Sequence, residues 1–73
     1  MKLSTVYGST PAAKGPEEME RMIGRDFWGG SSCDLREEVP GNVWSVWSHG
    51  NTRKSSLVVV RKGGRFQFGP VAP

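Results

Sequence analysis

The clearest pattern of apolar and polar positions lies in the last third of the chain. Between residues 43 and 69, three runs rich in valine and aromatic residues are separated by short turns, at 43–48, 55–62 and 65–68. Gly63-Gly64 suits a two-residue hairpin because both glycines adopt positive φ without steric cost. Gly50-Asn51 suits a type II′ turn between the first two runs. We therefore predict an antiparallel β-meander over 43–69, with the pairing ended at Pro70.

The register that the glycine turn imposes assigns side chains to two faces of the sheet. Opposite residues share a face, and the expected pairs are Lys62 with Arg65, Arg61 with Phe66, and Val59 with Phe68. One face then carries four apolar residues, and we expect a helix to pack there: Leu57, Val59, Phe66 and Phe68. The other face carries Val58 and Val60, while Trp44 and Trp47 point to opposite sides of their own strand.

The first third of the chain is predicted to hold one short strand and one helix. Alternation from Leu3 to Tyr7 indicates a strand within residues 1–7, and residues 8–15 lack periodicity and indicate a loop. Pro16 is a favourable first helical residue, and the acidic residues after it complement the positive end of the helix dipole. Gly24 can adopt the left-handed conformation that stops a helix, so the helix is predicted over 16–24.

Residues 25–42 carry the weakest pattern. We predict a loop that Phe27 and Trp28 anchor to the core, with at most one helical turn at 34–38. One helix covers one face of the sheet, so this loop either folds over the second face or leaves an apolar patch for a partner. The expected fold class is α+β: a small single domain with a three- to four-stranded antiparallel sheet and one short helix.

Length and composition narrow the cellular setting. Seventy-three residues suit one domain, and the single cysteine, Cys33, cannot form a disulfide within the chain. The N-terminus has one positive charge without the apolar stretch that a signal peptide needs, and no run reaches membrane-spanning length. We expect a monomeric cytoplasmic protein without membrane contact.

Charge is distributed unevenly along the chain, whose formal net charge is +3. Residues 1–38 hold five basic and seven acidic residues, whereas residues 39–73 hold five basic residues and no acidic one. These five predict a basic face: Arg53, Lys54, Arg61, Lys62 and Arg65. Such a face either serves solubility or meets phosphates or an acidic protein surface.

Catalysis and metal binding find little support in the sequence. Cys33, Asp34 and His49 could supply a nucleophile, a carboxylate and a base, but no oxyanion-type motif accompanies them and so short a chain does not readily enclose a substrate. Structural zinc needs four Cys or His ligands, and the chain contains two such residues. We predict a non-enzymatic protein without cofactor, metal or small-molecule substrate.

Two binding functions remain open. Basic residues interleaved with aromatic ones could stack bases and follow a phosphate backbone, as in a stand-alone nucleic-acid-binding module; the aromatic residues are Trp44, Trp47, Phe66 and Phe68. A protein interface is the other function, with candidate contacts at Val6, Tyr7, Trp44 and Trp47. The segment around Val6 and Tyr7 either orders on contact with a partner or pairs with the domain's own sheet.

In size and build the whole chain resembles the very small transcription regulators with which phages act on the host RNA polymerase. The resemblance is carried by the length, the short helix after Pro16, the meander from Val43 to Phe68 and the solitary Cys33. It implies a protein of the host cytoplasm that binds bacterial RNA polymerase near the RNA exit region, inhibits initiation by disturbing the σ factor, and promotes antitermination. RNA is a further candidate partner. A basic face would speed encounter with a large acidic partner of this kind.

Overall fold

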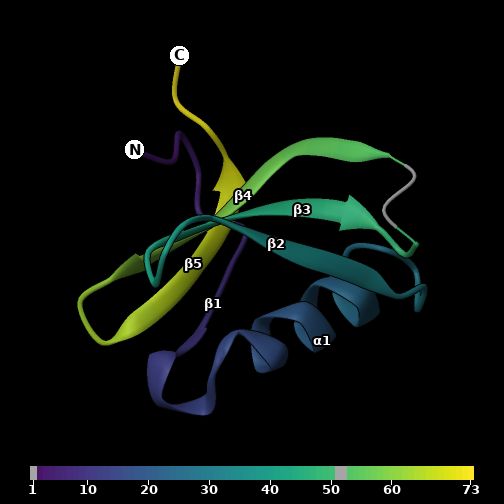
Figure 1. Ribbon diagram of the computed structural model, residues 1–73, viewed down its shortest axis with the longest axis horizontal. Coiled ribbons are helices and arrows are strands. Elements are labelled where there is room, and N and C mark those ends of the chain that lie inside the picture. Colours follow the sequence, from purple (N-terminus) through teal and green to yellow (C-terminus); the bar gives the residue numbers. More distant parts are fainter. Residues whose placement is uncertain (1, 51–52) are drawn as a thin grey trace.

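The computed structural model describes residues 2–50 and 53–73 and shows a five-stranded antiparallel sheet with one α-helix on one side (Figure 1). The strand order across the sheet is β1-β5-β4-β3-β2. The α+β class is confirmed, with one strand more than predicted. The elements in chain order are β1 (Gly8–Pro11), the 3₁₀ helix η1 (Ala12–Lys14), α1 (Pro16–Asp26), β2 (Cys33–Val39), β3 (Val43–Ser48), β4 (Lys54–Lys62) and β5 (Arg65–Pro70).

The hairpin of β4 and β5 has the predicted register. Its three expected pairs are all present, around a turn in which Gly63 has a φ of 60°. The pairing of β5 with β4 ends at Pro70, as predicted, but the strand continues two residues past its predicted end at Phe68. Pro70 itself pairs with Leu57, and its carbonyl accepts a hydrogen bond from Ser4 N at 2.9 Å. Proline lacks a donor but keeps its acceptor. The predicted Gly50-Asn51 turn lies partly outside the described residues.

The core lies between α1 and the sheet. Met19 and Ile23 project from α1 onto the face predicted to receive the helix, where both are fully buried. The cluster is completed by residues of four strands: Cys33, Trp44, Val46, Val59, Phe66 and Phe68. Burying a large apolar side chain stabilises the fold by roughly 1.5–3 kcal/mol. This face, which we call the helix face, therefore holds most of the apolar stabilisation.

Helix α1 begins at Pro16 as predicted but continues to Asp26, two residues beyond the predicted end. Gly24 does not stop it. The residue stays inside the helix and is buried, and a Cβ placed there would lie 2.7 Å from the backbone oxygen of Ser31. The glycine thus permits the close approach of the following segment instead of a left-handed turn.

Two strand predictions in the first half were wrong. Residues 33–39, predicted to lie in a loop or a helical turn, form the edge strand β2, which pairs with β3. The first strand is β1 at residues 8–11 instead of residues 1–7, and it pairs with β5. β2 pairs with the strand that follows it in the chain, whereas β1 pairs with a distant one. In both cases pairing overrides a weak local pattern, since strand propensity depends strongly on context.

The face away from α1, which we call the opposite face, holds a smaller apolar cluster. Val43, Val58 and Val60 are buried there, and Leu3 packs against them. Neither predicted alternative for this face, cover by the segment 25–42 or an open apolar patch, describes it fully: residues 33–39 form the sheet edge, and Leu3 of the N-terminal segment packs on the cluster. Figure 1 shows the chain just after residue 1 and the C-terminal residues on the side away from α1. Among residues 2–50 and 53–73, no helix is long and apolar enough to cross a membrane.

Candidate protein interface

Residues 2–7 lie along the end of β5 and are fixed by backbone hydrogen bonds. Tyr7 N donates to the Phe68 carbonyl at 2.7 Å, and the Lys2 carbonyl accepts from Ala72 N at 2.8 Å. Leu3 forms a single antiparallel bridge with Val71. Of the two alternatives for this segment, pairing with the domain's own sheet is the one the structure shows.

The two predicted contact residues of this segment point to different sides of the sheet. The Tyr7 ring stacks on Phe27, with centroids 5.9 Å apart, and meets the edge of Phe68 at 6.0 Å, so it lies at the rim of the helix face. Val6 lies on the opposite face with Val60 and Gln67. Their side chains are 49% exposed for Val6 and 48% for Tyr7. Large apolar groups so exposed on an ordered backbone are suited to a protein contact.

Val6 forms one wall of a hollow of about 330 Å³ on the opposite face. We call it the basic hollow. Its lining includes the neighbouring pair Val60 and Gln67 of β4 and β5 and three cationic residues. None of the described residues that line it is acidic: they are Lys2, Leu3, Val6, Val60, Arg61, Lys62 and Gln67. Like charges gathered around a hollow create a positive potential that attracts an acidic group.

The five predicted basic residues are all exposed, but they form two groups instead of one face. Arg61 and Lys62 line the basic hollow, and Arg65 lies opposite Lys62 with its Nε donating to Ser9 Oγ at 2.8 Å. Arg53 and Lys54 lie at the other end of β4. Eight residue steps of about 3.3 Å separate the groups by roughly 25 Å.

The acidic residues all lie on α1 and on β2. Some are neutralised by neighbours there. A hydrogen bond and ion pair with Arg21 lower the pKa of Glu18, and a hydrogen bond from Arg25 lowers the pKa of Asp26. The molecule is therefore dipolar, with its acidic residues on α1 and β2 and an acid-free hollow across the sheet.

The two predicted tryptophan contacts have different surroundings. Trp44 is 7% exposed and meets the edge of Phe66 at 5.1 Å, so its prediction as a partner contact does not fit the structure. It is needed in the core. Trp47 lies on the opposite face as predicted, half-buried beneath the Arg36 guanidinium at 4.9 Å, with its indole N–H donating to Ser45 Oγ. The guanidinium covers the ring face that a base or partner would use.

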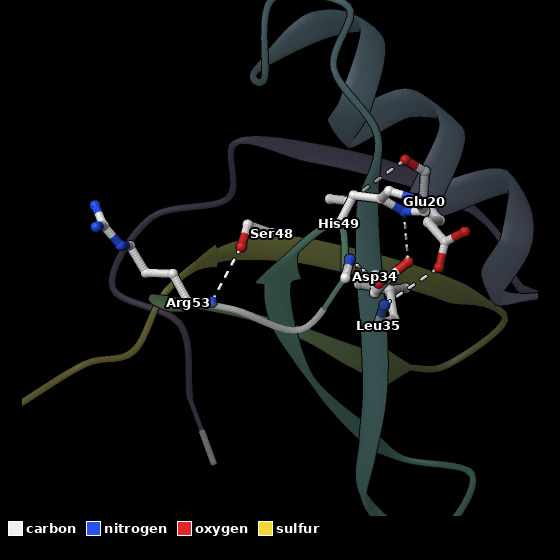
Figure 2. A network of polar contacts seen from close by, with 8 residues as sticks. Glu20, Asp34, Leu35, Ser48, His49 and Arg53 are labelled. Carbon is white, nitrogen blue, oxygen red and sulfur yellow. Dashed lines mark hydrogen bonds and ion pairs between the residues drawn. The ribbon is translucent and has the colours of Figure 1, made fainter.

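The residues considered for catalysis do not come together as a nucleophile and base. His49 Nδ1 lies 3.5 Å from Asp34 Oδ1, and Gly50 N donates to Asp34 Oδ2 at 3.0 Å, so this pair ties β2 to the β3 end (Figure 2). Cys33 lies in the helix-face core with its Sγ directed to the Glu20 carbonyl. Burial raises its pKa to about 11, which keeps the thiol protonated at neutral pH. In the described part of the chain, no group of three or more His, Cys, Asp or Glu residues could hold a metal.

Comparison of the chain with protein families, with curated proteins and with solved structures finds no match. The resemblance to phage transcription regulators therefore stays a prediction from size and build. Several residues that the structure brings to the candidate sites were missed from the sequence: Lys2, Leu3, Phe27, Trp28 and Gln67. Only the half-exposed aromatic pair Phe27-Trp28 carried a local signal, because large aromatic groups next to glycines are unusual in a solvated loop.

Proposed function

We propose that this protein is a non-enzymatic, cytoplasmic regulator that acts by binding bacterial RNA polymerase. The observation that carries the proposal is the N-terminal interface, which we define as Val6, Tyr7 and the basic hollow. It joins exposed apolar side chains to three cations on an ordered backbone. Such a combination fits a partner surface with an apolar centre and an acidic rim.

The concentration of exposed apolar groups supports this location. Among the described residues, five large hydrophobic side chains are exposed, and four lie in or against the N-terminal segment: Val6, Tyr7, Phe27 and Val71. The remaining one is Val39 on the far edge of the sheet. Interfaces depend on a few central anchors, and aromatic residues are prominent among them.

The choice of RNA polymerase comes from the resemblance in size and build. On that basis the protein inhibits initiation by disturbing the σ factor and promotes antitermination from a position near the RNA exit region. A small rigid domain suits this role, because it acts by occupying a surface and needs no catalytic group. The cations supply fast, salt-dependent association with an acidic partner.

The first test is affinity capture from bacterial lysate with the tagged 73-residue chain, with and without nuclease, followed by mass spectrometry. We expect RNA polymerase subunits to be captured in both cases. Capture of nucleic acid alone, abolished by nuclease treatment, would overturn the proposal and favour the stand-alone nucleic-acid-binding module.

Matched variants locate the interface on purified polymerase. Val6 and Val39 are exposed to 49% and 47% and lie on opposite edges, so Val6→Ala and Val39→Ala remove the same atoms at two places. We expect Val6→Ala and Tyr7→Ala to weaken polymerase binding by more than 1 kcal/mol, about fivefold or more. Val39→Ala is expected to bind as the wild type does. Equal effects of Val6→Ala and Val39→Ala on polymerase binding would contradict the assignment of the N-terminal interface.

A further inference from the structure

A second hollow, of about 420 Å³, lies at the other end of the sheet from the basic hollow. We call it the Trp28 hollow. It brings together residues that are about 20 positions or more apart along the chain: Trp28 with Ser48, Arg53, Lys54 and Ser55. None of the described residues that line it is acidic. It shares no residue with the N-terminal interface, so whatever it binds is additional to the proposed function.

Backbone hydrogen bonds hold Trp28 in place through both its N–H and its carbonyl group. Its N–H donates to the Ile23 carbonyl at 3.0 Å, and its carbonyl accepts from Ser31 N at 3.1 Å. The indole is half-buried, packing in part against the helix-face core while also lining the hollow. A rigid aromatic group that is already positioned loses little conformational entropy when a ligand stacks on it.

The two cations are positioned by the end of β3. Ser48 N donates to the Arg53 carbonyl at 2.9 Å, and Arg53 N donates to Ser48 Oγ at 3.1 Å. Figure 2 shows the Arg53 side chain extending away from the Asp34 and His49 pair, so that carboxylate does not neutralise it. Lys54, the residue that follows Arg53, pairs with Trp47 of β3.

An irregularity in β4 shapes the remaining wall. Between the pairs Ser45–Val58 and Trp47–Lys54, β4 contains two more residues than β3. Ser55 lies in this bulge, where its hydroxyl donates to the Val46 carbonyl at 2.9 Å and accepts from Leu57 N at 3.2 Å. Bulges redirect side chains and are frequent beside binding sites. The two hydrogen bonds of the Ser55 hydroxyl therefore hold this part of the lining in place.

An indole beside two cations, with no acid in the lining, matches the chemistry of a nucleotide. The indole offers a stacking surface for a base, and the cations offer partners for the phosphates on either side of it. The volume lies within the range of small-ligand sites. We propose that the Trp28 hollow binds one nucleotide unit of a single-stranded nucleic acid, with its base on Trp28 and its phosphates at Arg53 and Lys54. The hollow is therefore expected to accept different bases, because stacking and charge act without base-edge hydrogen bonds.

The test measures binding of a fluorescently labelled oligouridylate of about ten nucleotides by anisotropy, at several salt concentrations. Trp28→Leu keeps an apolar side chain in the core contact but removes the stacking surface, and we expect it to weaken binding about fivefold or more. Trp28→Phe restores an aromatic ring and is expected to recover most of the affinity. Circular dichroism on each variant establishes that the fold is kept.

A charge-matched pair of double variants separates this hollow from general electrostatics. Arg53→Gln with Lys54→Gln removes the same two charge types as Arg61→Gln with Lys62→Gln. The first pair is expected to lower the salt slope of log K by about 0.7 for each phosphate that the protein no longer neutralises, and the second to leave it nearly unchanged. An equal fall in affinity for the two double variants, or no binding by the wild type, would overturn the proposal.

Competition identifies the ligand class. We expect an unlabelled RNA oligomer to displace the probe far better than uridine monophosphate, because the monomer supplies one phosphate only. Displacement by poly-glutamate as effective as by the oligomer would show an acidic-peptide site and contradict the nucleotide assignment. These results are independent of polymerase capture, so either proposal can fail alone.

Discussion

The two faces of the sheet differ in how they are covered. On the helix face, α1 closes over a core in which Met19, Ile23 and Phe68 are fully buried. On the opposite face, three buried valines have Leu3 as their cover, and cations surround the neighbouring hollow. One face is sealed by a regular element and the other by a hydrogen-bonded but irregular segment. The difference indicates that stability is concentrated on the first face and partner contact on the second.

The largest expected effect on stability comes from removing a buried side chain on the helix face. Phe68→Ala removes a fully buried ring and should lower the free energy of unfolding by about 3–5 kcal/mol. Val60→Ala, on the opposite face, should lower the free energy of unfolding by about 1.5 kcal/mol, because it removes the equivalent of two methylene groups from a smaller cluster. Urea denaturation followed by circular dichroism measures both. A larger loss of stability for Val60→Ala than for Phe68→Ala would contradict the conclusion that stability is concentrated on the helix face.

An intermediate effect is expected where the N-terminal segment crosses the sheet. A Cβ placed at Gly69 would collide with the Thr5 carbonyl oxygen, so Gly69→Ala must displace the segment. We expect the free energy of unfolding to fall by about 1–3 kcal/mol and amide exchange at Ser4 and Tyr7 to become faster. Gly64→Ala is the control, since nothing lies within 4 Å of a Cβ there. Unchanged exchange at Ser4 and Tyr7 in the Gly69 variant would show that the segment is not held as described.

The effect that is smallest at neutral pH concerns Cys33 and is confined to alkaline solution. The pKa of Cys33 is raised from 9.0 to about 11, chiefly by burial, so folding favours the protonated thiol. Its stabilising contribution is complete below pH 9 and is lost as the pH rises to about 11. Relative to Cys33→Ala, the wild type should therefore lose stability over this range. A difference in urea midpoint that stays constant from pH 9 to 11 would contradict burial of the thiol under α1.

The sequence allowed prediction where a local rule determines the structure. Gly63-Gly64 fixed the β4–β5 register, and Pro16 marked the start of α1. Strand β2 was missed because Asp34 to Glu38 is mostly charged, as suits an edge strand that must not pair with another molecule. Strand β1 was missed because a Gly-Ser-Thr-Pro segment forms a strand only when β5 is present as a template.

The candidate sites were less predictable than the fold. Val6, Tyr7 and the five basic residues are exposed, as a contact role requires, but the division of the cations into two groups follows from the position of β4. The basic hollow depends on Lys2 meeting Arg61 and Lys62 across most of the chain. Such a contact has no signal in a local window, because it exists only after the N-terminal segment has paired with β5.

The most direct test of the division between the faces is amide hydrogen exchange of the protein alone and bound to purified RNA polymerase. We expect added protection in residues 2–7 and at the adjoining ends of β4 and β5, where Lys62 and Gln67 lie, with exchange in β2 unchanged. Protection confined to β2 or to the outer surface of α1 would contradict the account, because it would place the partner on the acidic side of the molecule.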